Sequence, residues 1–162
     1  MPKLYLLRHA QAEGGFDKND KDRALTTHGI EQSKEVSAHL KSIDLCLCSS
    51  ATRTKMTLEN AIEGGTKISN TSHLDELYNA PAGVLLNAVQ QADTSKNLLL
   101  IAHNPGIHQL ANILCSEDET TIREKLWFQY APATLSILDC SIQKWADIQP
   151  AQNILLNFIT ID

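Results

Sequence analysis

Apolar and polar positions along the chain follow two patterns. Short runs rich in Leu, Ile and Val predict strands, and longer stretches with apolar residues at helical spacing predict helices between them. The predicted strands are 3–8, 44–48, about 66–70, 97–102, 133–139 and 154–161, with a shorter one near 143–148. The predicted helices are Thr27–Leu40, Ala51–Ile62, a helix that begins at Pro81 and runs through Val89, and a helix capped by Asn104–Pro105 that runs through Leu114.

The order of these elements predicts an α/β fold. Strands and helices alternate over the first two thirds of the chain, which favours a mainly parallel central sheet covered by helices on both faces, a three-layer α/β/α sandwich. The run 98–101 is apolar at every position, as in a strand buried on both faces. The last third is rich in strands and predicts antiparallel neighbours that close the sheet. With 162 residues and no repeat or linker, we expect one domain over 1–162.

Composition narrows the function. The net charge is −5 and the pI about 5.6, which argues against general affinity for nucleic acid or an anionic membrane. No run approaches the roughly 20 apolar residues of a membrane helix. The first strand begins directly after Met1 and Pro2, so we expect no signal peptide and a cytoplasmic location. Four cysteines, at positions 46, 48, 115 and 140, lack the spacing of a metal or redox site, and we expect buried free thiols.

Two histidines follow two of the predicted strands. Arg8 and His9 end the first strand, and His103 ends the apolar strand 97–102. The carboxyl ends of parallel strands lie on one rim of a sheet, where ligands bind in open α/β folds. A neutral imidazole can act there as a nucleophile, and a neighbouring guanidinium can bind a phosphoryl group through charge-assisted hydrogen bonds.

Three other charged side chains lie where strands meet helices. Arg53 falls in the first turn of a predicted helix, a favourable place for an anion, although a solvated arginine is the simpler interpretation. Arg23 either folds back over the rim or faces water. The segment Asp75–Tyr78 offers a carboxyl group that is either catalytic or simply solvated. The other histidines are expected to be exposed or structural: His28, His39, His73 and His108.

In combination, these motifs resemble the histidine phosphatase superfamily, which has the phosphoglycerate mutase-like fold. The motifs are Arg8–His9, Ser49–Thr54 and His103–Gly106, in that order along the chain. The likeness is closest to the small SixA-type phosphohistidine phosphatases, whose Asp-Arg-x-Leu-Thr-x-x-Gly and Glu-Leu-Tyr patterns match Asp22–Gly29 and Glu76–Tyr78. The likeness spans almost the whole chain.

The resemblance implies a role for each matched residue. His9 would be the nucleophile that is transiently phosphorylated. Arg8, Arg53 and His103 would surround the phosphoryl oxygens, and Arg23 is a further candidate contact. Phosphoryl transfer needs mainly positioning and stabilisation of spread negative charge, which arginine supplies without a metal. No metal or other cofactor is therefore expected.

Glu76 is the candidate general acid. In larger members of the superfamily a glutamate protonates the leaving oxygen, and Glu76 lies in about that region of the sequence. A phosphohistidine expels an imidazole, which needs less help than an alkoxide. Three interpretations of Glu76 therefore stay open: an acid, a contact for the leaving group, or neither.

The expected substrate is a phosphate carried by a protein. The chain has no insertion long enough to form a cap over the site, so the site should be shallow and open. The resemblance implies phosphohistidine in a histidine-phosphotransfer domain or a phosphotransfer carrier protein, hence a part in signal transduction, and we expect a monomer. Two alternatives stay open: a phosphatase of small phosphate esters, and a non-catalytic module that binds phosphoproteins.

Overall fold

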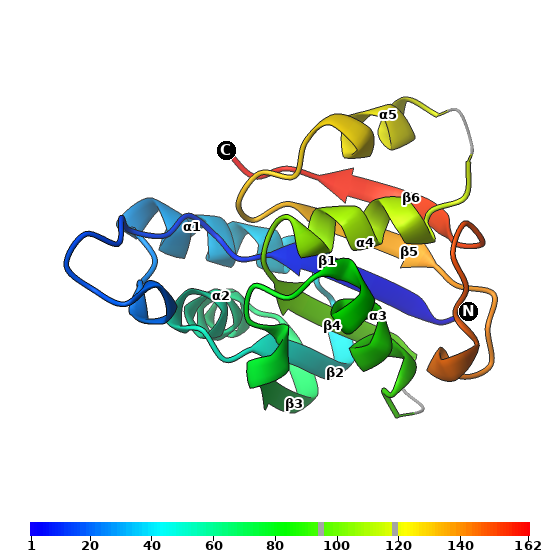
Figure 1. The fold of residues 1–162 in the computed structure, drawn as a ribbon, viewed down its shortest axis with the longest axis horizontal. Helices are drawn as coiled ribbons and strands as arrows, with labels where there is room; N and C mark the ends of the chain where they lie inside the picture. Colours follow the sequence, from blue (N-terminus) through cyan, green and yellow to red (C-terminus); the bar gives the residue numbers. More distant parts are fainter. Residues whose placement is uncertain (94–95, 118–119) are drawn as a thin grey trace.

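The protein is built around one mixed sheet of six strands in the order β3-β2-β4-β1-β5-β6 (Figure 1). The computed structural model describes residues 1–93, 96–117 and 120–162. The strands are β1 (Lys3–Arg8), β2 (Ser42–Ser49), β3 (Lys67–Leu74), β4 (Asn97–Ala102), β5 (Leu135–Asp139) and β6 (Ile154–Ile159). The first four run parallel, while β5 pairs antiparallel with β1 and β6 antiparallel with β5. The predicted α/β fold with a mainly parallel sheet is confirmed.

Helices cover both faces of the sheet. They are α1 (Thr27–Val36), α2 (Thr52–Glu63), α3 (Ala82–Gln90), α4 (Gly106–Leu114) and α5 (Thr121–Phe128). Successive side chains of a strand point to opposite faces, so β1 and β4 supply two cores. Leu4 and Leu6 pack with α3, α4 and α5, whereas Tyr5 and Leu7 pack with α1 and α2. Strand β4, which is apolar from Leu98 to Ala102, is buried on both faces, as predicted.

The register of the two central strands positions the functional residues. β1 and β4 pair in parallel with Arg8 opposite Ala102, and the backbone N–H of His9 donates to the carbonyl of Ala102 at 3.2 Å. The residues that follow the two strands, His9 and His103, therefore emerge next to each other at the same end of the sheet.

Two differences from the predicted elements have a simple physical cause. The strand expected near 143–148 is wrong, since a short 3₁₀ helix, η4 (Trp145–Asp147), lies there. Trp145 and Ile148 are both buried in the same core, and residues three apart share a side in a 3₁₀ turn but not in a strand. Helix α5 had no prediction, because Leu126 is its one buried residue and the apolar pattern is correspondingly weak.

The N-terminus of α4 also differs from the prediction. The helix begins at Gly106 and Asn104 does not cap it. Its side-chain amide instead donates to the backbone carbonyl of Tyr130 at 2.9 Å, so it joins the end of β4 to the segment before β5. The predicted N-cap role of Asn104 is therefore wrong.

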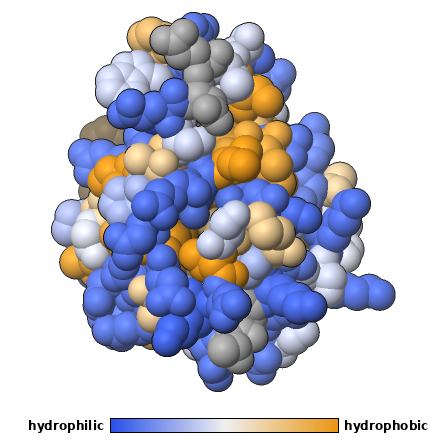
Figure 2. All heavy atoms as spheres, turned by 90° about the vertical axis from the view of Figure 1, so that its right-hand side faces the viewer, coloured by the Kyte–Doolittle hydropathy of each residue, from blue (hydrophilic) through white to orange (hydrophobic). Residues whose placement is uncertain are grey.

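The remaining composition-based expectations concern burial and the surface. All four cysteines are buried free thiols, as predicted. Within the described ranges, none of the helices is long and apolar enough to cross a membrane. Figure 2 shows the end of the molecule where β1 begins, away from the carboxyl ends of the parallel strands. This surface is mostly hydrophilic, with hydrophobic areas between the hydrophilic residues.

Candidate active site

His9 and His103 face each other at the carboxyl ends of β1 and β4. Their ring centroids lie 5.3 Å apart with an interplanar angle of 55°. The residues are only 7% and 2% exposed, so neither ring is a surface group. Close approach of two nearly buried imidazoles at the mouth of a parallel sheet is the arrangement that the two sequence motifs predicted.

A hydrogen bond fixes which nitrogen of His9 is free. Nδ1 lies 2.7 Å from the carbonyl oxygen of Ala10. A carbonyl can only accept, so the ring hydrogen is on Nδ1 and the lone pair is on Nε2. Burial is the main cause that lowers the pKa of His9 to about 4, with further contributions from Arg53, Arg8 and Arg23, against the opposing effect of the Ala10 bond. At neutral pH the imidazole of His9 is thus uncharged, with the lone pair of Nε2 available.

His103 is likewise held neutral and oriented. Its Nε2 lies 2.8 Å from the hydroxyl of Ser49, the last residue of β2. When that hydroxyl donates to Nε2, the ring hydrogen of His103 is on Nδ1. Burial, then the proximity of His9 and Arg53, lowers the pKa of His103 to about 3.

Two arginines reach the histidines from different elements. Arg8 ends β1, and its Nη1 donates to the carbonyl of Tyr130 at 2.9 Å. Arg53 lies in the first turn of α2, as predicted, and is 2% exposed. Thr57 ties these elements together, since its hydroxyl donates to the Arg53 carbonyl and accepts from the N–H of Ala10. The sheet end and the helix start therefore present both guanidinium groups to one place.

Several buried nitrogens of the site have no hydrogen-bond partner among the described residues. They are Nε of Arg8, Nε of Arg23, Nε of Arg53 and Nδ1 of His103. Buried polar groups in proteins are nearly always paired, so four unpaired donors in one site indicate that the site is built to bind an acceptor. The donors and the positive charge of the guanidinium groups fit an oxyanion.

These residues line a common pocket. Its volume is about 310 Å³. Its lining consists of Arg8, His9, Gln11, Ala12, Asp20, Arg23, Arg53, Asn79, His103, Asn104 and Pro132. Arg23 thus folds toward the pocket, one of the two alternatives left open for it. The structure brings five of the six predicted site residues together.

Comparison with known proteins agrees with this geometry. Residues 4–82, which include Arg8, His9 and Arg53, match the model of the histidine phosphatase superfamily (branch 1). This part of the chain therefore resembles the histidine phosphatase superfamily, in agreement with its sequence motifs. The chain is also 27% identical over 160 residues, 94% of this chain and 98% of the other, to an uncharacterized protein of Mycobacterium tuberculosis.

Solved structures show the phosphoglycerate mutase-like fold of the superfamily. One is a proposed phosphohistidine phosphatase SixA of Nakamurella multipartitia, with a TM-score of 0.84, 24% identity and coverage of 98% of this chain and 95% of that one. Another is the corresponding protein of Agrobacterium tumefaciens, with a TM-score of 0.79, 22% identity and 99% coverage of both chains. A third, the protein histidine phosphatase SixA complexed with tungstate, has a TM-score of 0.74 and 18% identity, covering 98% of this chain and 96% of that one.

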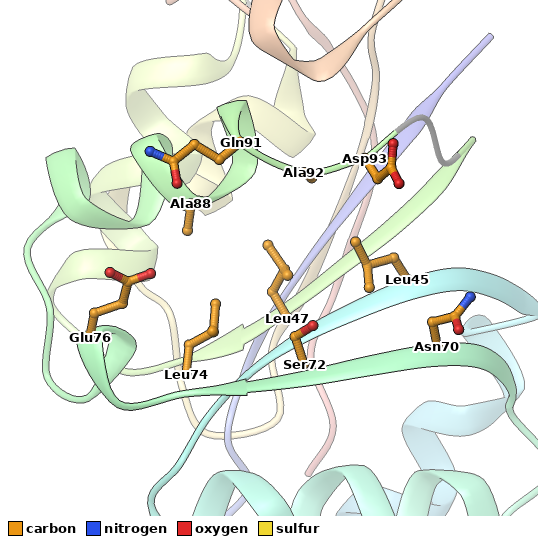
Figure 3. A pocket seen from close by; sticks show the side chains of 10 residues that line it. All are labelled: Leu45, Leu47, Asn70, Ser72, Leu74, Glu76, Ala88, Gln91, Ala92 and Asp93. Atoms are coloured by element: carbon orange, nitrogen blue, oxygen red, sulfur yellow. The ribbon is translucent and has the colours of Figure 1, made fainter.

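Glu76, the candidate acid, does not reach the pocket that His9 and His103 line. It is exposed on the 3₁₀ helix η3 (Asp75–Leu77) and lines a different cavity of about 550 Å³, between β2, β3 and α3 (Figure 3). The tight turn buries Leu77 and directs Glu76 outward. The expected place of Glu76 beside the other site residues is therefore corrected. Tyr78 approaches the site instead, with its ring 5.6 Å from that of His103.

Sequence reasoning missed Asp20, Tyr78 and Asn79. Asp20 lies on the 3₁₀ helix η1 (Asp20–Asp22), in the loop between β1 and α1, and accepts hydrogen bonds from Arg53, Tyr78 and Asn79. One signal was available: Asp20 precedes Arg23 by three residues, a spacing that allows an ion pair. Its contact with Arg53, 33 residues away, had no sequence signal.

The other histidines agree with prediction. His28, His39 and His73 are exposed. His108 is partly buried on α4, with Nε2 2.6 Å from the carbonyl oxygen of Leu126, a contact between α4 and α5. None of the four lines the pocket.

Proposed function

We propose that this protein is a phosphohistidine phosphatase that works through a phospho-His9 intermediate, with arginines rather than a metal supplying the positive charge. One observation carries the proposal. A neutral, nearly buried imidazole, with Nδ1 tied to Ala10 and Nε2 free, lies in a cup with unpaired nitrogens of Arg8, Arg53 and His103.

In the first step Nε2 of His9 attacks phosphorus. A P–N bond to His9 forms, the P–N bond to the substrate imidazole breaks, and its electron pair returns to the substrate nitrogen. Negative charge spreads over the three phosphoryl oxygens, and the fixed donors of Arg8, Arg53 and His103 stabilise it without reorganisation.

In the second step water attacks the phosphorus of phospho-His9. The P–N bond breaks, the electron pair returns to Nε2, and dihydrogen phosphate leaves. The hydrogen on Nδ1, held by the Ala10 carbonyl, makes phospho-His9 a protonated ring that departs as neutral imidazole. The same hydrogen bond therefore serves both steps.

The acid–base groups of the pocket favour an imidazole leaving group. An alkyl phosphate releases an alkoxide, which needs a proton from a general acid. Among the described residues, Asp20 is the one carboxyl group that lines the pocket. Its hydrogen bond from Tyr78 and the charge of Arg53 lower its pKa to about 2, so it holds no proton to give. An imidazole with a hydrogen on its second nitrogen leaves without such help.

A panel of substrates tests the proposal. Wild type and His9→Ala are offered purified histidine-phosphotransfer domains and carrier proteins phosphorylated on histidine, and small esters such as sugar phosphates. Wild type should dephosphorylate the proteins rapidly and form an acid-labile phosphate on His9. In His9→Ala the rate should fall about 10³-fold or more, because the nucleophile is missing. His28→Ala, a change at an exposed histidine, should match wild type.

Three results would contradict the proposal. Strong ester hydrolysis beside negligible phosphohistidine hydrolysis would indicate a small-ester phosphatase. Binding of phosphoproteins with neither turnover nor labelled His9 would indicate a binding module. A loss smaller than about tenfold in His9→Ala would be too little for a missing nucleophile.

A further inference from the structure

The carboxylate of Asp20 is fixed at the wall of the phosphate pocket. Its Oδ2 accepts from Nη2 of Arg53 at 3.1 Å, from the hydroxyl of Tyr78, and from Nδ2 of Asn79 at 3.4 Å. Nη1 of Arg53 also donates to the backbone carbonyl of Asp20 at 2.8 Å. The two nitrogens of Arg53 that donate to Asp20, Nη1 and Nη2, belong to one rigid, planar guanidinium, so this group sets the position of the carboxylate.

A second set of contacts holds the whole turn in place. Lys21 forms an ion pair with Asp75 at 3.2 Å, and its Nζ lies 5.6 Å from the centroid of the Tyr78 ring. Helix η1 is thus held against the segment 75–79 by Lys21, which pairs with Asp75, and by Asp20, which accepts from Tyr78 and Asn79. Asp20 is an organised feature of the site although it comes from an exposed loop.

One oxygen of this carboxylate keeps acceptor capacity. The Asp20 side chain is 49% exposed. Nε of Arg23 lies 3.1 Å from Oδ1, but that Nε makes no hydrogen bond of adequate geometry within the described residues. Each carboxylate oxygen has two lone-pair positions, so Oδ1 can accept a hydrogen bond from a ligand in the pocket.

We propose that Asp20 determines specificity by accepting a hydrogen bond from the second ring nitrogen of the departing phosphohistidine. This inference rests on the proposed function. A phosphohistidine ring carries phosphorus on one nitrogen and, when protonated, an N–H on the other. The ionised Asp20 favours this protonated, cationic ring. An ester oxygen at the same place has no N–H and gains nothing from the carboxylate.

The bond changes show why this contact accelerates the reaction. His9 Nε2 bonds to phosphorus, the P–N bond of the substrate breaks, and its electron pair returns to the nitrogen that held phosphorus. The hydrogen on the second nitrogen stays where it is. The leaving group is then neutral imidazole, whereas an unprotonated ring would have to leave as the far more basic imidazolate anion.

For inorganic phosphate and simple phosphate esters, the charge of the pocket predicts that the Asp20 carboxylate is unfavourable. Asp20 lies against Arg53 and Arg23, so it offsets part of the positive charge that attracts phosphate dianions. Its removal should strengthen the binding of inorganic phosphate and of simple phosphate esters while it weakens catalysis with phosphohistidine. If removal of the carboxylate slows phosphohistidine hydrolysis but not ester hydrolysis, Asp20 recognises the leaving group. If it slows both, Asp20 only maintains the structure of the site.

The test compares Asp20→Asn with Asp22→Asn, a change at an exposed acid of the same turn. The substrates are a histidine-phosphotransfer domain phosphorylated on histidine and p-nitrophenyl phosphate, whose leaving group needs no protonation. In Asp20→Asn, kcat/KM for phosphohistidine should fall about tenfold or more, while that for p-nitrophenyl phosphate stays equal or rises. The alkaline limb of the phosphohistidine profile should also move to lower pH. Asp22→Asn should resemble wild type in every measurement.

Other results overturn the inference in distinct ways. A parallel loss on both substrates would mean that Asp20 only positions Arg53. A parallel gain would mean that its carboxylate merely occupies the anion site. Wild type without any phosphohistidine activity would overturn the proposed function and this inference together. Tyr78→Phe, which removes one donor to Asp20 and leaves the carboxylate, should show the same substrate-dependent pattern with a smaller amplitude.

Discussion

The imidazole of His103 and the hydroxyl of Ser49 lie 2.8 Å apart, although 54 residues separate them in the chain. Ser49 ends β2, and His103 follows β4, the strand beside it in the sheet. The hydroxyl is buried and is positioned to fix the tautomer of His103. An interaction between the ends of two neighbouring strands thus leaves Nδ1 of His103, and not Nε2, available to a phosphoryl oxygen in the proposed reaction.

The change Ser49→Ala should therefore reduce activity. Alanine leaves Nε2 of His103 without its partner, and we expect kcat/KM for the phosphohistidine substrate to fall about tenfold (~1.4 kcal/mol). Steady-state kinetics on a phosphorylated histidine-phosphotransfer domain measures this. Ser72→Ala, a similar change on β3 beside the cavity that Glu76 lines, is the control and should have no effect. Wild-type kinetics in Ser49→Ala would contradict the role of Ser49 in orienting His103.

The change Arg53→Lys should be costly even though it preserves charge. Nη1 of Arg53 donates to the backbone carbonyl of Asp20, and Nη2 donates to the carboxylate of Asp20 and to the side-chain oxygen of Asn79. Nε has no partner among the described residues. One ammonium cannot reproduce that fork, so we expect kcat/KM to fall about 10²-fold. Arg123→Lys, at an arginine of α5 that binds Asn112, serves as the control. Activity within about twofold of wild type in Arg53→Lys would contradict this role.

Stability should fall as the pH drops from 6.5 to 4.5. The folded pKa values of His9 and His103, about 4 and about 3, lie below the ordinary value of 6.5. In this window the unfolded chain takes up protons at both histidines and the folded protein takes up almost none, so acidification favours unfolding. Each histidine should lower the free energy of unfolding by roughly 2 kcal/mol, measured by urea titration at the two pH values.

A variant separates this effect from other titrations. His9→Asn should have about half the pH dependence of wild type, because one of the two groups is removed. Asp20 does not contribute, since its pKa of about 2 and its ordinary value of 3.8 both lie below the window. A free energy of unfolding that is unchanged between pH 6.5 and 4.5 would contradict the pKa shifts of both histidines.

Two glycines should respond to alanine in opposite ways. A Cβ at Gly106, the first residue of α4, would lie 2.0 Å from the carbonyl oxygen of Ala80, which must then move. We expect Gly106→Ala to lower the free energy of unfolding by about 2 kcal/mol or more. It should also reduce activity, because Ala80 follows Asn79 of the pocket wall.

Gly83→Ala is the matched change in a neighbouring helix. Gly83 lies in α3, is exposed, and has nothing within 4 Å of an added Cβ. Alanine there should raise the free energy of unfolding by about 0.5–1 kcal/mol through helix propensity alone. Urea titration of both variants measures the contrast. Equal effects of the two substitutions would contradict the close contact at Gly106.

The accuracy of the sequence interpretation followed the strength of the local pattern. Strand β4 was predicted to the residue, 97–102, because burial on both faces leaves an uninterrupted apolar run at 98–101. The edge strand β3 was predicted near 66–70 but extends over Lys67–Leu74. The prediction was too short because most residues of this strand are exposed and polar, so they leave little apolar pattern. Trp145 and Ile148 were assigned to a strand because two apolar residues alone do not reveal the period of the backbone.

The same limit applies to the site. Arg8, His9 and His103 end or directly follow strands with strong patterns, so their meeting at one end of the sheet was predictable, whereas the local pattern around Arg53 favoured a solvated side chain. The direction of Glu76 was not predictable, because it depends on how a single 3₁₀ turn buries Leu77.

By itself, the sequence determined that a parallel sheet would deliver Arg8, His9 and His103 to one rim, whereas Arg53 was placed beside them only by the resemblance to a known family. The reason is that strand identity, strand direction and the residue after each strand are encoded locally, by hydrophobic periodicity and by what interrupts it. Only the tertiary structure decided that Asp20 would lie against Arg53 and Tyr78, 33 and 58 residues away. That contact depends on how two exposed turns are positioned across the pocket. Tertiary packing sets their position, and it produces no periodic pattern of apolar residues that could be recognised in the sequence.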